Sequence, residues 1–110
     1  GFSKRIIAYR NKLGGFHKVE QLKEVYGLPD STYLHIKDRI VINAEGFRKI
    51  NINLASEEEL AAHPYIGKFM AAGIIRLRND MKTFKNISDL RQVPLINEEK
   101  YRKIVPYIQL

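Results

Sequence analysis

Positively charged side chains are the most abundant chemically active groups in this sequence. The 110 residues include 19 lysines and arginines against 12 aspartates and glutamates, which gives a formal net charge of +7. A positive balance of this size favours polyanionic partners, such as nucleic acid or an anionic membrane surface. Solubility alone could also explain the charge, because composition does not distinguish a binding surface from a solvated one.

The residue types that catalysis or metal binding would need do not form recognisable sets. The three histidines, His17, His35 and His63, have no spacing that suits a metal, and the chain contains no cysteine. We find no Ser-His-Asp set, no paired carboxylates and no phosphate-loop motif. The sequence therefore predicts a binding protein that is not an enzyme, with no cofactor, no metal and no small-molecule substrate.

A helical pattern is interrupted for only four residues near the middle of the chain. In the stretch SEEELAAHPYIGKFMAAGII, Ser56–Ile75, Ser56 is a good N-cap and Glu59 completes a capping box. The proline of PYIG ends this helix, and Gly67 allows the turn from which a second apolar helix begins. Four residues suffice to fold one helix back on another, so we predict a helical hairpin with Ile66 as an apolar plug.

The chain aligns with itself when it is shifted by 68 residues. Residues 1–40 match residues 69–108 without a gap at ten of forty positions, and seven of the identical residues are aliphatic or phenylalanine. Such self-similarity is typical of a tandem duplication. The identical pairs are Ile6/Ile74, Ile7/Ile75, Arg10/Arg78, Asn11/Asn79, Phe16/Phe84, Leu22/Leu90, Val25/Val93, Tyr33/Tyr101, Ile36/Ile104 and Ile40/Ile108.

The matched apolar residues have helical spacing, which predicts an all-α fold. In the first copy, the positions matched in apolar type follow one another at intervals of four, three and four residues: Phe2, Ile6, Tyr9 and Leu13. A left-handed cap at the glycines 14–15 should end this helix. Tyr33 and Tyr101 share the core spacing and are predicted to be structural. Further helices are expected at 19–25 and 30–40, and at 88–93 and 97–108, with Ser88 and Asn97 as N-caps and only 48–53 hinting at a strand.

This pattern divides the chain into two units. Residues 1–42 are the predicted first unit, residues 43–53 a linker and residues 54–110 the second unit. The second unit has an additional helix and hairpin ahead of its matched region, and their counterparts in the first unit would lie upstream of Gly1. We therefore expect the first unit to lack its first helix and hairpin, as a fragment of a longer protein would.

Residues 51–110 resemble the ComEA family of helix-hairpin-helix domains, which includes the DNA receptor of bacterial competence. The resemblance implies an all-α fold of tandem helix-hairpin-helix units of the SAM and RuvA domain 2-like type. Residues 1–42 match the same pattern without its start. The matching segments are Asn51–Asn53 for the initial segment, Ser56–His63 for the Ser-capped helix, Pro64-Tyr65-Ile66-Gly67 for Pro-Gly-Ile-Gly, Leu77-Arg78 for the final Tyr-Arg, and IIAYRNKLGGF at 6–16 for the first copy.

The resemblance implies binding of double-stranded DNA without sequence specificity, in DNA uptake during competence or in DNA processing. In this family, glycines let the hairpin approach a phosphate, free amides at the start of the next helix bind it, and a nearby cation adds charge. For Gly67, a role in the turn alone is an equally good interpretation, and Tyr65 could simply lie over Pro64. Carried over to this sequence, the DNA-binding residues would be Tyr65, Ile66, Gly67 and Lys68 in the second unit and Lys4, Arg5 and Gly27 in the first.

The sequence departs from the family pattern in every hairpin that it contains. Tyr65 replaces the first glycine of one hairpin, Pro94-Leu95-Ile96-Asn97 has no glycine, and Pro29 removes an amide beside Gly27. The alternative is therefore a degenerate module for protein–protein interaction or assembly, as in secretion machinery, with apolar residues at the hairpin tips. The matched pair Arg10/Arg78 could bind phosphate, but capping of nearby carbonyls explains it at least as well.

The predicted partners are the phosphate backbone of double-stranded DNA or, in the alternative interpretation, a protein. No run of residues approaches the roughly 18 apolar residues of a membrane span, so no membrane contact is expected for this segment. Resemblance to ComEA-like proteins implies an extracytoplasmic, membrane-anchored location for a longer parent protein.

Overall fold

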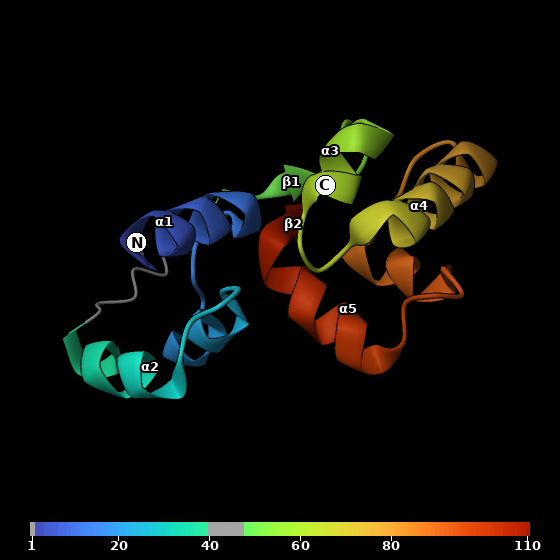
Figure 1. The fold of residues 1–110 in the computed structure, drawn as a ribbon. Helices are drawn as coiled ribbons and strands as arrows, with labels where there is room; N and C mark the ends of the chain where they lie inside the picture. Colours follow the sequence, from blue (N-terminus) through green and yellow to red (C-terminus); the bar gives the residue numbers. More distant parts are fainter. Residues whose placement is uncertain (1, 40–47) are drawn as a thin grey trace. The chain divides into compact units, whose positions relative to one another are not determined.

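Short helices joined by tight turns make up most of the chain, which the computed structural model describes over residues 2–39 and 48–110 (Figure 1). The chain divides into two units, Gly1–Arg48 and Lys49–Leu110. Both units are built from the helices that the repeat predicts, and the all-α fold class is confirmed.

In the first unit, α1 is the longest helix, and shorter helical segments follow it. It ends as the sequence predicts: the amides of Gly14 and Gly15 both donate to the Arg10 carbonyl over 3.0 Å, with φ values of +96° and +127°. Glycine tolerates these angles, so the pair caps the helix and redirects the chain. The elements are α1 (Phe2–Leu13), the 3₁₀ helix η1 (Val19–Glu24), α2 (Asp30–Ile36) and the 3₁₀ helix η2 (Lys37–Arg39).

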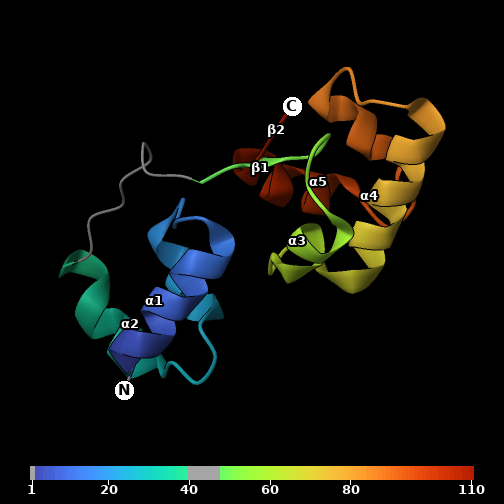
Figure 2. The same ribbon diagram turned by 90° about the horizontal axis from the view of Figure 1, so that it is seen from above.

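The second unit contains a complete helical hairpin and a short pair of parallel strands. Strand β1 pairs with β2, and Ile50 lies opposite Ile108 (Figure 2). Residues 49–53, which the sequence pattern places in a linker, belong to this unit, and Ile52 is fully buried. The elements are β1 (Ile50–Asn51), α3 (Glu57–Ala62), α4 (Gly67–Met81), the 3₁₀ helix η4 (Ile87–Gln92), α5 (Glu98–Ile104), the 3₁₀ helix η5 (Val105–Tyr107) and β2 (Ile108–Gln109).

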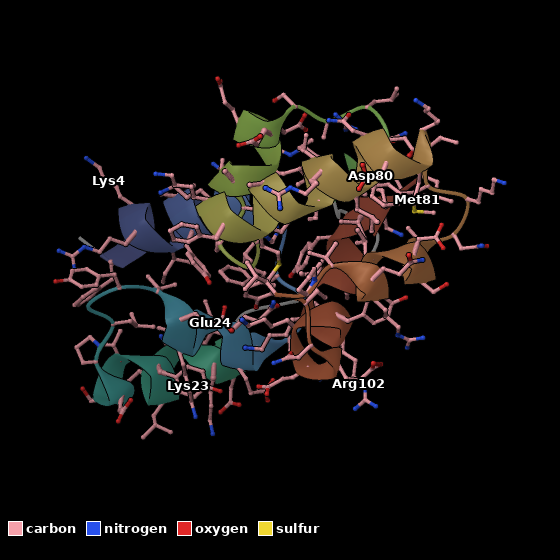
Figure 3. All side chains as sticks on the ribbon, turned by 90° about the vertical axis from the view of Figure 1, so that its right-hand side faces the viewer. Lys4, Lys23, Glu24, Asp80, Met81 and Arg102 are labelled. Carbon is pink, nitrogen blue, oxygen red and sulfur yellow. The ribbon has the colours of Figure 1, made fainter. Side chains whose placement is uncertain are left out.

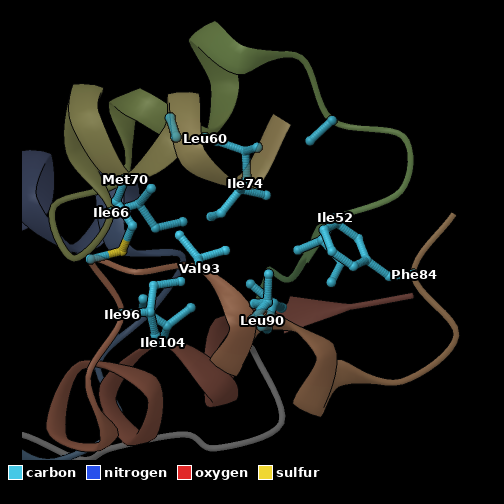
Figure 4. Close-up of a cluster of buried hydrophobic side chains, with 13 residues drawn as sticks. Ile52, Leu60, Ile66, Met70, Ile74, Phe84, Leu90, Val93, Ile96 and Ile104 are labelled. Atoms are coloured by element: carbon cyan, nitrogen blue, oxygen red, sulfur yellow. The ribbon is translucent and has the colours of Figure 1, made fainter. Parts of the chain in front are cut away.

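Apolar residues of the turns close the core of the second unit. Ile66, in the turn before α4, and Ile96, in the turn before α5, are only 7% and 5% exposed and belong to one buried cluster (Figure 4). This confirms the prediction of Ile66 as an apolar plug, and Ile96 has the same role in the second turn of this unit. The cluster also includes Ile52, Ala55, Leu60, Met70, Ala71, Ile74, Phe84, Leu90, Val93, Ile104 and Ile108.

Two of the three predicted N-caps are confirmed. Ser56 Oγ accepts a hydrogen bond from the Glu59 amide over 3.0 Å, and Asn97 Oδ1 accepts one from the Lys100 amide over 2.8 Å. Each side chain satisfies a backbone donor that has no partner within its helix. These caps fix the start of α3 and of α5.

The third predicted N-cap, Ser88, is wrong. Helix η4 begins one residue earlier with Asn86 as its N-cap, and Ser88 is exposed within the helix. The start is held from inside the helix, because the Asp89 carboxylate accepts hydrogen bonds from the amides of Lys85 and Asn86 over 3.0 and 3.1 Å. In the first unit, Gln21 has the same role at the equivalent position and accepts from the Lys18 amide over 2.9 Å.

The last helix of each copy changes from α-helix to 3₁₀ helix before its predicted end. Helix α5 ends at Ile104 and continues as η5, since Pro106 has no amide to extend the α-helical pattern. The chain then extends into β2, which contains Ile108. In the first unit, α2 ends at Ile36, and Ile40 lies outside the described residues.

The matched tyrosines are structural, as predicted. Tyr33 is buried and Tyr101 is partly buried against the core. Each also carries a cation over its ring: Lys23 Nζ lies 4.8 Å from the Tyr33 centroid and Arg91 Cζ 4.3 Å from the Tyr101 centroid. The two copies therefore preserve the same cation–π contact with different cations.

One residue of the second unit adopts a conformation that L-amino acids rarely take. Lys82, directly after α4, has φ +73° and ψ −47°, whereas Gly14 occupies the equivalent position in the first unit. A side chain in such a region costs about 1–3 kcal/mol. We expect Lys82→Gly to raise the free energy of unfolding of the second unit by about 1 kcal/mol, because the strain exceeds the entropy that glycine adds to the unfolded chain.

Urea denaturation monitored on the second unit measures this gain. Lys85→Gly is the control, because Lys85 is exposed and its φ is not positive, so glycine there relieves no strain. A Lys82→Gly variant no more stable than the original chain would show that the position is not strained.

Candidate nucleic-acid interface

The turn between α3 and α4 is open to solvent at its glycine. Gly67 has φ +76°, and a Cβ built on it would meet no atom within 4 Å. A glycine is therefore required by the backbone angle, and the space above it is free for a close approach. Lys68 is exposed and Phe69 is 76% exposed in the next two positions, and the Lys68 Nζ lies 6.0 Å from the Phe69 ring centroid.

The amides that the sequence pattern offers to a phosphate are already paired within the turn. Those of Ile66 and Gly67 both donate to the His63 carbonyl, over 3.0 and 3.2 Å. The Tyr65 amide donates to His63 Nδ1 over 3.1 Å. The expectation that the Ile66 and Gly67 amides face an anion is therefore wrong, because the turn itself consumes them.

The next two amides along the chain are better placed. Helix α4 begins at Gly67 without a side-chain cap and without an acidic residue in its first turn. The structure records no acceptor for the amide of Lys68 or of Phe69 among the described residues. The first turn of a helix presents donors and a partial positive charge, which together favour an anion. The free amides of this turn are thus those of Lys68 and Phe69, two residues beyond the predicted amides of Ile66 and Gly67.

Tyr65 stabilises the turn from the inside. Its ring lies 5.5 Å from the His63 ring and 5.8 Å from the Tyr107 ring, both buried, and Lys103 Nζ lies 5.5 Å from its centroid. Tyr65 therefore packs on the rings of His63 and Tyr107. The two interpretations of Tyr65 from the sequence, packing over Pro64 and contact with DNA, did not include these rings. Together with the buried Ile66, it holds the turn against η5 and leaves Gly67 and Lys68 outward.

In the first unit, the structure brings two predicted residues together. Gly27 has φ +76°, and a Cβ built on it would lie 2.5 Å from Arg5 Nη1. The guanidinium of α1 thus lies directly on the turn before α2, and Arg5 Cζ is 5.7 Å from the Phe2 ring centroid. Lys4 is exposed on the same helix, and its side chain extends away from the ribbon (Figure 3). Tyr26, beside Gly27, is 89% exposed.

Among the described residues, no carboxylate forms an ion pair with Lys4, Arg5 or Lys68. Their charge is therefore available to a ligand, whereas that of Arg91 is paired with Glu98.

The second hairpin of the second unit is closed to anions. Asn97 caps the amide of Lys100 with its own side chain, and Glu98 begins the helix with a negative charge. The Glu98 carboxylate accepts a hydrogen bond from Arg91 over 2.8 Å, and this guanidinium stacks on Tyr101. A phosphate here would meet a carboxylate and no free glycine backbone, so this hairpin contributes structure only.

Arg78 has a structural role. Its Nη1 donates to the carbonyls of Ile52 and Ala55, over 3.1 and 2.7 Å, and so ties the segment before α3 to α4. Arg78 does bind carbonyls, but they belong to a segment distant in the sequence and not to the end of its own helix, as the prediction of local capping required. The counterpart Arg10 is exposed.

Two kinds of feature are absent from the described residues. Nowhere in residues 2–39 and 48–110 do three or more histidines, aspartates or glutamates gather as metal ligands would. In the same residues, no helix is long and apolar enough to cross a membrane.

Comparison with known families agrees with the repeated hairpins. A family model of the helix-hairpin-helix motif matches residues 1–41 and 45–109. The chain belongs to the helix-hairpin-helix family. This motif generally binds nucleic acid, so membership of the family implies nucleic-acid binding in general. No solved structure matches the chain significantly.

Two longer proteins are similar to this chain. Both are named "Endonuclease/exonuclease/phosphatase family domain-containing protein 1". The chain is 30% identical to the one from Danio rerio over 94% of this chain and 22% of that protein. It is 27% identical to the one from Xenopus laevis over 93% of this chain and 22% of that protein. This helix-hairpin-helix chain thus spans about a fifth of the length of these relatives.

Proposed function

We propose that this chain binds double-stranded DNA through the phosphate backbone, with little sequence preference. The observation that carries the proposal is the turn at Gly67: a glycine with open space above it, an uncapped helix start, and Lys68, which forms no ion pair with any described residue. Glycine permits close approach, the free amides of the first turn donate to phosphate oxygens, and lysine adds charge. None of these contacts reads a base, so sequence discrimination should be weak.

The first unit offers a second contact of a different kind. Pro29 leaves the turn before α2 without one amide, and Arg5 covers the same turn with a guanidinium. A guanidinium can bind two phosphate oxygens at once, which compensates for a missing amide donor. We therefore assign phosphate contact to Arg5 beside Gly27, with Lys4 adding long-range attraction.

We also propose that the chain has no catalytic activity of its own and serves DNA processing in a longer protein. The relatives carry a nuclease and phosphatase family name, and the chain covers only about a fifth of their length. A phosphate-binding module could hold a DNA substrate near a catalytic domain. We therefore favour DNA processing over the DNA uptake that a ComEA-like pattern implies.

The alternative, a protein-interaction module, has less support. It predicts exposed apolar side chains at positions 65, 95 and 96. Leu95 is 49% exposed, but Tyr65 is packed on two rings and Ile96 is 5% exposed. Of these three side chains only Leu95 is exposed, although Tyr26 and Phe69, 89% and 76% exposed, also present apolar rings beside two of the turns.

Charge reversal at Lys68 tests the proposal. We expect Lys68→Glu to weaken binding of a fluorescent duplex of about 20 base pairs by about tenfold at low salt, because it removes a phosphate contact and adds repulsion. The matched control is Lys85→Glu, which changes the net charge equally beyond the opposite end of α4, about 22 Å away for 15 residues. Fluorescence anisotropy at fixed ionic strength measures both.

Charge at the control position is largely screened at this distance, so Lys85→Glu should change affinity by less than about twofold. Equal losses for the two variants would indicate attraction by net charge alone. No detectable binding by the original chain at low salt would overturn the proposed function.

A further inference from the structure

Two aromatic side chains are exposed to solvent beside the proposed phosphate contacts. Tyr26 is 89% exposed directly before Gly27, and Phe69 is 76% exposed two residues after Gly67. Apart from Phe2, every other phenylalanine and tyrosine that the structure describes is buried or partly buried. A single exposed apolar residue is ordinary on a protein surface, but here each ring adjoins a turn whose glycine has φ +76°. The two most exposed rings of the described chain thus lie at the two turns to which we assign phosphate contact.

Each exposed ring has a cation close to it. Lys68 Nζ lies 6.0 Å from the Phe69 ring centroid, and the Arg5 guanidinium lies against Gly27, next to Tyr26. In the part of the chain that the structure describes, neither cation forms an ion pair with a carboxylate. A nucleotide joins a planar base to a phosphate, so an exposed ring beside such a cation matches its two parts.

Helix α4 extends this surface beyond the ring of Phe69. Ala72 and Arg76 follow Phe69 by three and seven residues, so they lie on the same face of the helix, and both are exposed. Ala72 has only a methyl group there, which leaves the ring open to an approaching base. Arg76 lies about 10 Å further along the helix axis and forms no ion pair with any described residue. A strand with one base on Phe69 can therefore place a second phosphate at Arg76.

The faces of nucleic-acid bases are accessible only where their stacking is interrupted. In an intact duplex each base is stacked on its neighbours, and side chains in the grooves contact base edges. In a single strand the faces are accessible, and aromatic side chains stack on them with little sequence preference. An exposed ring beside a cation therefore favours unpaired bases over paired ones.

We propose that Phe69 and Tyr26 stack on unpaired bases, so that the chain also binds single-stranded DNA through ring and phosphate contacts together. The inference rests on the proposed phosphate contacts at Lys68 and Arg5, and it adds the base as an uncharged second part of the ligand. Each unit supplies one ring and one cation, so each is a complete contact of this kind.

Substitution of Phe69 tests the inference on two fluorescent probes, an oligothymidylate of about 20 nucleotides and a blunt duplex of about 20 base pairs. We expect Phe69→Ala to weaken binding of the single strand by about tenfold and to change binding of the duplex by less than about twofold. Phe69→Tyr should keep the original affinity for the single strand because a ring remains, whereas Phe69→Leu should lose as much as alanine does. Leu54→Ala is the matched control, because Leu54 is 81% exposed in the same unit but lies before α3, and it should change neither affinity.

A probe without bases separates stacking from charge. An abasic oligomer of the same length has the same phosphates, and the original chain should bind it about tenfold more weakly than oligothymidylate. Phe69→Ala should not weaken abasic binding further, whereas Lys68→Ala should weaken binding of both single strands. Equal affinity of the original chain for the two single strands would overturn the inference.

Tyr26→Ala gives the corresponding test in the first unit. It should weaken binding of oligothymidylate but not of the abasic oligomer, and Leu34→Ala is its control because Leu34 is 59% exposed in the same unit. An effect of Phe69→Ala without any effect of Tyr26→Ala would overturn the assignment of Tyr26.

The results distinguish this inference from the proposed function. Duplex binding that depends on Lys68, with single-strand binding insensitive to both rings, would overturn the inference and leave the proposed function in place. Single-strand binding that depends on the rings, without duplex binding, would support the inference and overturn the proposed function. Equal losses for Phe69→Ala on the single strand and the duplex would indicate a wedge between base pairs and contradict stacking on unpaired bases.

Discussion

Replacing Ile74 by alanine is expected to lower the free energy of unfolding of the second unit by about 2–5 kcal/mol. Ile74 is fully buried in the centre of α4, within the cluster that joins α3, α4 and η4 (Figure 4). The truncation removes apolar surface from the core and leaves a cavity between elements that are fixed by their caps and turns. Urea denaturation followed by a signal from the second unit measures the loss.

The same substitution at the repeat counterpart gives the control. Ile6 is only partly buried, whereas Ile74 is fully buried. Ile6→Ala should therefore lower the free energy of unfolding by about 1 kcal/mol or less. A partly exposed side chain stays partly hydrated in the folded state, so its truncation removes less buried apolar surface. Equal losses at the two sites would mean that the two helices are equally enclosed, contrary to the burial that the structure shows.

The repeat and its helices were predictable because they depend on local signals. An apolar side chain every three or four residues places one face of a helix against a core whatever surrounds it. The glycines 14–15 and the Ser56 and Asn97 caps act within a few residues of their own position, and all three are found as predicted. The error at Ser88 and the early end of α5 arise where two local signals compete.

The strand pair and the role of Arg78 depend on contacts distant in sequence. Ile50 meets Ile108 only after the whole second unit has folded, and a two-residue strand has almost no pattern of its own. Arg78 reaches two carbonyls that precede it by more than twenty residues. The identity of Arg10 and Arg78 indicated a shared role, but not which atoms accept.

The candidate site also combines local features, which the sequence predicts, with details of packing and chain path, which it does not predict. The open turn at Gly67 and the exposed Lys68 could be read from the helix break, because glycine and the following cation are local features. The pairing of the Ile66 and Gly67 amides with the His63 carbonyl could not, since it depends on the exact path of the turn. The placement of Arg5 on Gly27 also required the structure, because it joins two elements through their packing.

Binding of duplex DNA should fall about 40- to 150-fold between 50 and 200 mM salt if three to four phosphates are neutralised. The proposed ionic contacts are Lys4, Arg5 and Lys68. The first turn of α4 adds uncharged donors, which bind phosphate without releasing further counterions from the DNA. The plot of log affinity against log salt should therefore be linear with a slope of about −3. Anisotropy titrations at four salt concentrations measure it.

Single substitutions then separate the contributions to that slope. Lys68→Ala and Arg5→Ala should each make it shallower by about 0.9, because each removes one ionic phosphate contact, and Lys85→Ala should leave it unchanged. A slope near zero would exclude phosphate binding, whereas a steep slope that is insensitive to Lys68 and Arg5 would move the contact to other cations. If the slope responds to Lys68 alone, the turn at Gly67 is the ionic contact and Arg5 serves only to pack against Gly27.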